Sequence, residues 1–513
     1  MIGTVKEMIL KHYPVAKYIE LLKKERLFVS SSVSDEDRLI SGFTYDSRAV
    51  SEGTMFIVKG AHFKDEYLVS AFESGAAVYV SEMVLADRNE AIIVSDIRRA
   101  MPILASFFYN EPQKGLKTVG ITGTKGKSTT TYYIKDILEL HSKKSGTPGC
   151  GYVSSIDTYN GIEKFESHLT TPESPDVYRH LYSAASSGLG SFVMEVSSQA
   201  LKYNRVDGIK FDVACYTNIG EDHISPVEHS NFEDYFTSKL KIFDNCKIAC
   251  VNTDDAFANR VLEYIGTRVP VITYGSHKTD AIYCESHEKK DGKTHFKVRT
   301  PEWSDEIVLT MPGIFNISNA LAAIATAYVF GIPASTVKEA LYGARAGGRM
   351  QIYSSKDGEV TVIVDYAHNS MSFKALFDST EVEYPGAKMI SVFGCPGKKA
   401  HLRRRDLGQL SGQRCAHVII TEEDSGEEPF ASIASDIEKH VKAENCTYDI
   451  IEDRGEAIRR AIFLDIGPRV ILLTGKGEET RQKRGTLYIP CPSDVDYTLS
   501  LLEEYDASHV TLN

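Results

Sequence analysis

The chain has 513 residues, of which 42% are hydrophobic and 25% charged, a composition typical of a globular protein with room for about three domains. Its formal net charge of -12 argues against nucleic acid as a main partner, because a phosphate backbone binds to a basic surface. No apolar run approaches the roughly 18–20 residues that cross a bilayer, and the nine cysteines form no Cys-x-x-Cys pair, so we expect a monomeric cytoplasmic protein with reduced thiols and no membrane partner.

The first segment, residues 1–113, is predicted to form a small α/β domain. Residues 1–28 mix lysines with apolar residues, a pattern that indicates an amphipathic helix rather than a signal peptide. A second helix is expected at residues 67–75. Short strands are predicted at residues 43–48, 54–60, 77–80 and 91–95. The turn Tyr45-Asp46-Ser47-Arg48 has the composition of an ordinary surface turn.

A phosphate-binding loop follows a short apolar strand. The loop carries Gly123 and the triplet Gly126-Lys127-Ser128, and a run with helical spacing comes directly after it. Glycines let backbone N–H groups close around phosphate oxygens, and the start of a helix adds partial positive charge. We expect Lys127 to reach the outer phosphates and Ser128 to bind magnesium. The strict pattern has a glycine where this chain has Ile121, but strand, loop, Gly-Lys-Ser and helix are all present.

The second segment, residues 114–345, alternates strands and helices, as a parallel sheet requires. Glu195 ends one predicted strand, and Asn218 and His223 follow another. Because open α/β sheets bind ligands beyond the carboxyl ends of their strands, we expect these side chains to converge on the phosphates. Any one of them alone would more often be a structural residue. Their position at one sheet edge beside a phosphate loop favours a site.

A glycine-rich linker, Gly343–Met350, leads into the last segment, residues 346–513, and is predicted to act as a hinge. Apolar strands that each end in a polar loop are predicted at residues 360–365, 388–394, 417–421 and 470–474. This segment should form a second doubly wound domain whose loop-bearing edge faces the phosphate loop. The predicted fold class is therefore α/β in three domains: a small N-terminal α/β domain, a central P-loop-type parallel-sheet ATPase domain and a C-terminal Rossmann-like domain.

Seven short motifs together resemble the Mur ligases, the ATP-dependent amide-forming enzymes that build the peptidoglycan stem peptide. In chain order the motifs are Gly120–Ser128, Leu169–Ser174, Glu195–Gln199, Tyr235–Lys239, Gly348–Met350, Asp365–Asn369 and Gly475–Glu479. They occur in the family's order over almost the whole chain. Within the family, Thr170-Thr171-Pro172, Asp365–Asn369 and the turn Tyr45–Arg48 resemble the branch that adds the third residue to UDP-N-acetylmuramoyl-L-alanyl-D-glutamate.

The resemblance implies a role for each matched residue. Ser47 and Arg48 would hold the uridine diphosphate end, which gives their turn a function. The phosphates of ATP would be held by Gly123, Thr124, Lys125, Gly126, Lys127, Ser128 and Thr129, with Asn218 beside them. Adenine and ribose would contact Arg349, Asp365, His368 and Asn369. The muramoyl peptide would contact Thr170, Thr171, Ser197, Gln199 and Arg205.

The resemblance also implies magnesium, with Ser128 and Glu195 on one ion and His223 on a second. Lys239 matches a family position that is carbamylated, a change that turns an ammonium into the oxygen ligand that Mg²⁺ prefers. The catalytic residues implied are Lys127, Glu195, His223 and Lys239. The D-glutamate γ-carboxylate would attack the γ-phosphate of ATP to give an acyl phosphate and ADP. The amine of the incoming amino acid would then displace phosphate.

The loop Thr421–Pro429 departs from the best-known family pattern. Members that use meso-diaminopimelate carry Asp-Asn-Pro-Arg there, and the arginine pairs with the distal carboxylate. This loop reads Thr-Glu-Glu-Asp-Ser-Gly-Glu-Glu-Pro. Acidic groups suit a distal ammonium, so we expect L-lysine, with meso-diaminopimelate and ornithine as alternatives. The glutamates could instead form a solvated surface.

Four further residues match family positions that would contact the incoming amino acid. Lys399 and Arg404 are basic, so they could supply a cation that the acidic loop lacks. Gly475 matches a substrate-binding position, and Glu479 matches the glutamate that holds the amino end of the incoming amino acid, although Glu478 stands where the family usually has histidine.

Two other functions stay open. A folylpolyglutamate-synthetase-like enzyme shares the ATP loop and the acyl-phosphate chemistry, but its relatives lack an N-terminal nucleotide-sugar domain. A non-catalytic nucleotide-binding partner of a cell-wall enzyme would have no use for a carbamylated lysine at position 239, so the implied catalytic residues favour an enzyme.

Overall fold

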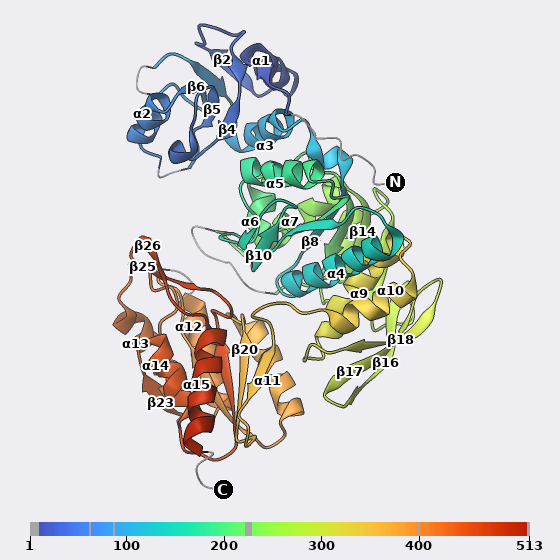
Figure 1. The fold of residues 1–513 in the computed structure, drawn as a ribbon, viewed down its shortest axis with the longest axis vertical. Coiled ribbons are helices and arrows are strands. Elements are labelled where there is room, and N and C mark those ends of the chain that lie inside the picture. Colours follow the sequence, from blue (N-terminus) through green and yellow to red (C-terminus); the bar gives the residue numbers. More distant parts are fainter. Residues whose placement is uncertain (1–9, 61–62, 86–87, 221–227, 399–400, 510–513) are drawn as a thin grey trace.

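The computed structural model describes residues 10–60, 63–85, 88–220, 228–398 and 401–509. Its three large sheets form three lobes, blue, green to yellow, and orange to red along the chain (Figure 1). Each predicted domain contains one of these sheets. All nine cysteines are free thiols. No helix among the described residues is long and apolar enough to cross a membrane.

The N-terminal lobe has a five-stranded sheet. Its order is β2 (Phe28–Ser31), β7 (Ala91–Val94), β6 (Ala76–Ser81), β5 (Thr54–Ile57) and β4 (Gly42–Thr44). Strands β4 to β7 are parallel and β2 is antiparallel. Helices α1 (Val15–Lys24), α2 (Asp65–Glu73) and α3 (Ile97–Phe108) cover it, and β1 (Tyr13–Pro14) pairs with β3 (Leu39–Ile40).

The helix predicted over residues 1–28 is shorter than expected. Within the described residues, α1 begins after Pro14 and ends at Lys24, because Arg26 takes a left-handed conformation with φ of 58° and the chain then enters β2. The buried side chains of α1 are Val15, Tyr18, Ile19 and Leu22, so the predicted amphipathic pattern is correct over the helix itself.

The central lobe is built on an 11-stranded sheet. Its order is β11 (Lys164–Glu166), β10 (Asp157–Tyr159), β9 (Cys150–Val153), β12 (Ser191–Glu195), β8 (Lys117–Thr122), β13 (Phe211–Tyr216), β14 (Cys246–Asn252), β15 (Val271–Gly275), β16 (Ile282–Lys290), β17 (Lys293–Arg299) and β18 (Ser304–Leu309). The seven consecutive strands β9, β12, β8, β13, β14, β15 and β16 are parallel to one another. At one end β10 and β11, and at the other β17 and β18, each pair antiparallel with the strand before them in the sheet. The antiparallel strands were not predicted, because the outer half of β16 is exposed and polar and so lacks an apolar signal.

Helices cover both faces of the central sheet. One layer contains α4 (Lys127–Ser145), α9 (Asn316–Val329) and α10 (Ala334–Gly343). The other contains α5 (Ser174–Ser186), α6 (Ser198–Lys202), α7 (Phe232–Leu240) and α8 (Ala258–Ile265). This second layer shares one continuous hydrophobic core with the N-terminal lobe, which fixes the two lobes against each other.

The C-terminal lobe has a six-stranded sheet ordered β19 (Gln351–Ser354), β20 (Val360–Asp365), β24 (Arg469–Thr474), β21 (Lys388–Phe393), β22 (His417–Ile420) and β23 (Thr447–Ile450). All strands but β19 are parallel. One face is covered by α11 (Ser370–Glu383), α12 (His401–Arg414) and α13 (Phe430–Ala443), and the other by α14 (Arg454–Ile462) and α15 (Asp494–His509). The hairpin of β25 (Arg481–Arg484) and β26 (Leu487–Pro490) extends towards the central lobe (Figure 1). The predicted doubly wound α/β fold is confirmed.

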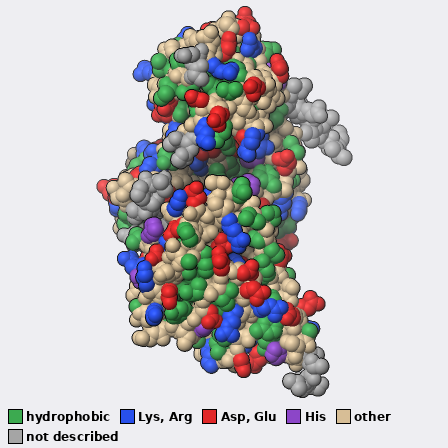
Figure 2. Space-filling view, turned by 90° about the vertical axis from the view of Figure 1, so that its left-hand side faces the viewer, with side chains coloured by type: hydrophobic (Ala, Val, Ile, Leu, Met, Phe, Trp, Pro, Cys, Tyr) green, Lys and Arg blue, Asp and Glu red, His purple; other side chains and the backbone are tan. Residues whose placement is uncertain are grey.

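Acidic and basic side chains are interspersed over the face of the molecule drawn in Figure 2, and apolar side chains lie between them. The cavity described below lies where the central and C-terminal lobes meet, beside the carboxyl ends of parallel strands of both sheets.

Candidate functional site

The phosphate loop connects β8 to α4, as predicted. Gly123 has φ of 152°, and a Cβ atom there would lie 1.9 Å from Thr217 Oγ1. Gly126 has φ of 83°, and its Cβ would lie 2.2 Å from Asn319 Oδ1. Both positions therefore require glycine, for backbone conformation and for space. The loop is closely held by the strand ends around it.

Two lysine ammonium groups meet at the same carbonyl oxygen of this loop. Lys127 Nζ donates to the carbonyl oxygens of Gly123 at 2.9 Å and Thr124 at 3.1 Å. Lys239 Nζ, from α7, donates to Gly123 O at 2.9 Å and lies 4.5 Å from the centre of the Tyr235 ring. Lys239 is buried, with 2% of its surface exposed, so it is not the solvated helix residue that its position in the sequence would suggest. Two close, poorly hydrated cations favour an anionic ligand at this place.

Asn218 supports the loop from the end of β13. Its Oδ1 accepts from Lys125 N at 2.9 Å, and its Nδ2 donates to Lys125 O at 3.1 Å. Thr217 Oγ1 donates to the same carbonyl at 2.7 Å, and Thr124 N donates to Asn218 O at 2.9 Å. Asn218 therefore positions the loop, and direct contact with nucleotide stays a prediction.

Glu195 and Ser128 lie in one cluster of oxygen atoms. The buried Glu195 Oε1 accepts from Ser155 N at 2.7 Å and Ser155 Oγ at 3.3 Å, and Ser155 Oγ is 3.0 Å from Ser128 Oγ. Hydroxyl and carboxylate oxygens are the donors that Mg²⁺ prefers, so this set fits a magnesium ion. Arg349 Nη2, from the linker before β19, donates to Ser128 Oγ at 3.1 Å. His223, the predicted ligand of a second ion, lies outside the described residues.

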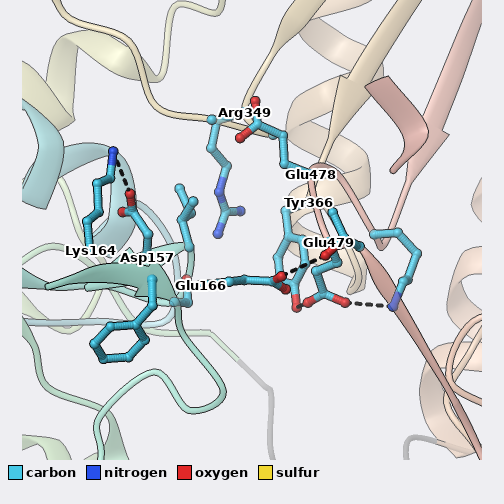
Figure 3. Close-up of a pocket in the computed structure, with 14 residues that line it drawn as sticks. Asp157, Lys164, Glu166, Arg349, Tyr366, Glu478 and Glu479 are labelled. Atoms are coloured by element: carbon cyan, nitrogen blue, oxygen red, sulfur yellow. Dashed lines mark hydrogen bonds and ion pairs between the residues drawn. The ribbon is translucent and has the colours of Figure 1, made fainter. Parts of the chain in front are cut away.

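A cavity of about 380 Å³ lies between the central and C-terminal lobes (Figure 3). In Figure 3, Arg349 extends between Asp157 and Lys164 on one side and Glu478, Tyr366 and Glu479 on the other. The cavity is lined by Ser155, Ile156, Asp157, Lys164, Phe165 and Glu166 of the central lobe and by Gly347, Gly348, Arg349, Tyr366, Lys476, Glu478, Glu479 and Thr480 from the C-terminal segment. The predicted facing of the two loop-bearing edges is confirmed.

A chain of polar contacts forms the C-terminal wall of the cavity. The Arg349 guanidinium lies 4.9 Å from the centre of the Tyr366 ring, and Tyr366 Oη donates to Glu479 Oε1 at 2.5 Å. Lys476 Nζ lies 2.7 Å from Glu479 Oε2 and 3.1 Å from Asp424 Oδ1. Burial raises the pKa of Tyr366 well above its usual value, so its hydroxyl stays protonated and can donate.

Three residues predicted to hold adenine and ribose have structural bonds instead. The buried Asp365 accepts from Met350 N at 2.9 Å and Ala367 N at 2.8 Å, and its burial raises its pKa. Asn369 caps α11 by accepting from Ser372 N at 3.1 Å, and His368 Nδ1 lies 2.8 Å from Tyr366 O. These bonds fix the backbone after β20, and nucleotide contact by these residues stays a prediction. Of the four predicted residues, only Arg349 lines the cavity.

The acidic loop after β22 is largely buried. Glu422 is 3% exposed and bonds Arg484 Nη2 at 2.7 Å. Glu423 is 9% exposed, and burial raises its pKa to about 8. In the part of the chain that the structure describes, the Glu423 carboxyl group has no hydrogen-bond or ion-pair partner. A Cβ atom on Gly475, where φ is 99°, would lie 2.2 Å from Glu423 Oε2. The reading of these two glutamates as a solvated surface is wrong, because both face the protein interior.

The basic residues expected near this loop are differently placed. Arg404 is buried and donates to both carboxylate oxygens of Glu428, at 2.7 and 2.8 Å, and to Asp436 at 3.1 Å. Its positive charge is therefore neutralised by carboxylates of its own lobe, and Arg404 does not line the cavity. Lys399 lies outside the described residues. Glu427, in contrast to Glu423, is a surface residue paired with Lys398 at 2.6 Å.

The residues predicted to contact the muramoyl peptide lie at the end of β12. Thr171 Oγ1 donates to Glu195 O at 2.9 Å and accepts from Ser197 N at 3.0 Å, while Arg205 Nη1 donates to Thr171 O at 3.0 Å. Ser197 also caps α6. Thr170 and Gln199 are half-buried beside them. Ser47 and Arg48 lie in a turn of the N-terminal lobe, where the exposed Arg48 pairs with Asp46 at 2.7 Å.

Most residues that line the cavity were not predicted from the sequence, among them Tyr366, Lys476 and Ser155. Tyr366 and Lys476 lie inside motifs that were recognised, so the motifs could have pointed to them. Ser155 lies in none of the recognised motifs and after no predicted strand, so nothing in the sequence near it indicates a site residue. It is found only because the fold brings it beside Glu195 and Ser128.

Comparison with known proteins gives two matches to family descriptions. Residues 121–327 match the Mur ligase middle domain, and residues 348–477 match the Mur ligase glutamate ligase domain. The UDP-N-acetylmuramoyl-L-alanyl-D-glutamate--L-lysine ligase of Enterococcus faecalis is 35% identical over 472 residues, which cover 90% of this chain and 92% of that protein.

Two further comparisons extend this result. The UDP-N-acetylmuramoyl-L-alanyl-D-glutamate--2,6-diaminopimelate ligase of Caldanaerobacter subterraneus is 36% identical over 461 residues, with 88% of this chain and 92% of that protein covered. A solved structure titled as a ligase of the same 2,6-diaminopimelate type aligns with a TM-score of 0.64 at 21% identity, covering 96% of this chain and 99% of that chain. The structural likeness supports the fold, and the sequence matches extend over all three lobes.

Proposed function

The chain belongs to the Mur ligase family, and from this premise we propose that it uses ATP to add the third stem-peptide residue, L-lysine, to UDP-N-acetylmuramoyl-L-alanyl-D-glutamate. The single observation that carries the proposal is the contact of Arg349 with Ser128. It joins the phosphate loop to Arg349, which lines the cavity between the two lobes, and in that cavity a phosphorylated acceptor could meet an incoming amine. The reaction would take place in the cytoplasm.

The reaction has two steps. The γ-carboxylate of D-glutamate attacks the γ-phosphorus of ATP, a carboxylate–phosphate bond forms, and ADP leaves. The amine then attacks the acyl carbon, the bond to phosphate breaks, and inorganic phosphate leaves as the new amide loses its extra proton. Because both reactants of the first step are anions, their approach must be made favourable electrostatically.

The residues of the chain supply this stabilisation. Lys127 places positive charge at the phosphate loop, where it bonds Gly123 O. Ser128 and Glu195 would hold magnesium, which supplies further neutralisation of phosphate charge when bound. A carbamylated Lys239 would add an oxygen donor on the same side. Arg349 and Tyr366 would orient the nucleotide from the C-terminal lobe.

The acidic loop supports lysine over diaminopimelate. Glu423 is buried against Gly475, and Asp424 bonds Lys476, so carboxyl groups surround this end of the site. A distal carboxylate would meet the negative charge of Asp424, whereas a distal ammonium would favour the ionised form of Glu423 and pair with it. No arginine stands in the loop from Thr421 to Pro429. The α-amino end of the amino acid would lie at Glu479.

A turnover assay tests the proposal. Purified protein with ATP, Mg²⁺ and the acceptor is supplied separately with L-lysine, L-ornithine or meso-diaminopimelate, and ADP release is measured. Lysine should support the fastest turnover. Turnover with diaminopimelate alone would overturn the assignment of lysine, and turnover only with a folate acceptor and glutamate would support the folylpolyglutamate-type alternative. If no combination of acceptor and amino acid supports turnover, the protein is instead a non-catalytic nucleotide-binding partner of a cell-wall enzyme.

A further inference from the structure

A buried cluster of charges lies where the N-terminal lobe meets the central lobe. Tyr45 follows β4 and Lys59 follows β5, so both lie at the carboxyl ends of parallel strands, the edge at which α/β sheets bind ligands. Lys59 Nζ lies 4.4 Å from the centre of the Tyr45 ring. The side chain of Lys59 is 19% exposed, so most of its surface is buried.

Two cations of this cluster share one carboxylate oxygen. Glu173, the residue before α5, has its Oε1 3.2 Å from Lys59 Nζ and 2.8 Å from Arg205 Nη2. Burial lowers the pKa of Lys59, Glu173 opposes this effect, and the charges of Arg205 and Arg98 add to it. Because two cations, Lys59 and Arg205, share one carboxylate, the cluster holds more positive charge than Glu173 neutralises. An anionic group is the ligand that relieves this excess.

Two unpartnered atoms also point to a ligand. Among the described residues, Glu173 Oε2 and Arg205 Nε are buried and have no hydrogen-bond partner, and Glu173 is only 6% exposed. Buried polar atoms are normally paired, since an unpaired one costs free energy. A ligand that completes this site offers an acceptor to Arg205 and a donor to Glu173. An anionic oxygen beside an amide or hydroxyl group has both.

The cluster joins the two halves of the expected acceptor site. On one side, Tyr45 leads directly into the turn that carries Ser47, and its hydroxyl donates to Asp176 Oδ2 at 2.7 Å. On the other side, Arg205 donates to the carbonyl oxygen of Thr171. A ligand that reaches from the Ser47 turn to the Thr171 loop passes Lys59.

We propose that Lys59 binds the acceptor: its ammonium group, with Arg205, holds an anionic oxygen group of the nucleotide-linked muramoyl dipeptide across the boundary of the two lobes. This rests on the proposed function, which supplies the acceptor. The acceptor carries two suitable groups, the diphosphate and the α-carboxylate of D-glutamate. Both present anionic oxygens, and the experiment separates them.

The test compares Lys59→Gln with the wild-type protein by calorimetric titration of the acceptor and of UDP-N-acetylglucosamine, which has the diphosphate but no carboxylate. Acceptor affinity should fall about 10- to 100-fold, the range for one lost charge-assisted hydrogen bond, and Lys59→Arg should restore most of it. KM for ATP and lysine should stay unchanged. A parallel loss for UDP-N-acetylglucosamine assigns the diphosphate, and a loss confined to the acceptor assigns the carboxylate.

A control variant separates the charge of Lys59 from a general loss of surface charge. Lys64→Gln removes an exposed lysine of the same lobe. It should bind the acceptor as the wild type does. If Lys59→Gln lowers Tm but binds the acceptor within twofold of wild type, Lys59 only joins the lobes and the proposal is wrong.

A measurement on the wild-type protein covers the case in which Lys59→Gln does not fold. The acceptor should slow the labelling of Lys59 by an amine-directed reagent, followed by peptide mass spectrometry, while Lys64 is labelled at an unchanged rate. Equal labelling of Lys59 with and without acceptor would overturn the proposal. Failure of the wild-type protein to bind the acceptor at all is a different result, because it rejects the proposed function itself.

Discussion

Replacement of Glu423 by glutamine tests the origin of amino-acid specificity. The variant keeps the shape of the side chain and removes its ability to ionise. A buried ion pair with the distal ammonium is worth about 1.5–3 kcal/mol as a charge-assisted hydrogen bond, which corresponds to a loss of roughly 10- to 100-fold in kcat/KM for lysine. KM for ATP should stay unchanged. Glu427→Gln, on the exposed side of the same loop, is the matched control.

The raised pKa of Glu423 also predicts how kcat/KM for lysine depends on pH. With a pKa of about 8, the free protein holds this group mostly protonated at pH 7. Ionisation to meet an ammonium then costs about 1.4 kcal/mol at pH 7, since each pKa unit is worth 1.36 kcal/mol. The kcat/KM for lysine should therefore rise between pH 6 and 8 and level off above pH 8. This rise should be absent in Glu423→Gln.

Stability should change in the opposite direction. The folded-state pKa of Glu423 lies above the ordinary value of 4.5, so the unfolded chain loses this proton first and stability falls as pH rises from about 4.5 to 8. Without substrate, Glu423→Gln should thus be more stable at pH 8, on the order of 1–3 kcal/mol by denaturant unfolding. A variant that keeps lysine kcat/KM within twofold of wild type, or that loses it together with stability, would refute the reasoning.

Three further predictions concern the phosphate loop and the C-terminal lobe. Lys239→Ala should lower turnover at least 100-fold in the ADP-release assay, because it removes the buried side chain that would be carbamylated, and added bicarbonate should not restore it. Wild-type turnover would remove Lys239 from the site. Gly126→Ala should bind ATP more weakly and lose about 1–3 kcal/mol of stability, because the added Cβ atom would collide with the side chain of Asn319. An unchanged Tm together with unchanged ATP affinity would contradict this. Arg404→Met should cost about 1–3 kcal/mol in denaturant unfolding, because Glu428 and Asp436 lose their charge-assisted bonds to the guanidinium. The ratio of lysine to ornithine turnover should stay the same, and a changed ratio would place Arg404 at the substrate.

The elements that the sequence predicts correctly are those whose own residues carry the pattern of a strand, a loop or a helix. The apolar strands β12 and β20 begin and end where their residues predict, because they are buried on both faces and stop at a polar residue. The phosphate loop is recognisable because glycine at positions 123 and 126 is a requirement of backbone geometry, which a sequence records directly. In contrast, the exposed half of β16 pairs with β17 through the backbone, and its polar side chains give no strand signal.

The site is harder to predict, because the same residue type has different roles in different surroundings. Glu423 and Glu427 belong to one acidic loop, but one is buried against Gly475 and the other pairs with Lys398 at the surface. Asn369 has the position of a nucleotide ligand in a recognised motif, yet its side chain caps α11. These roles depend on contacts between segments far apart in the chain, which sequence spacing does not contain.

We expect ATP cleavage by this protein to be coupled to the joining of lysine to the muramoyl dipeptide. Mass spectrometry of the product, with ADP measured in the same reaction, tests this most directly. One new species, the acceptor plus lysine less one water, should form in equal amount to ADP and only when ATP, acceptor and lysine are all present. ADP formed without that species, or formed equally well in the absence of lysine, would contradict it.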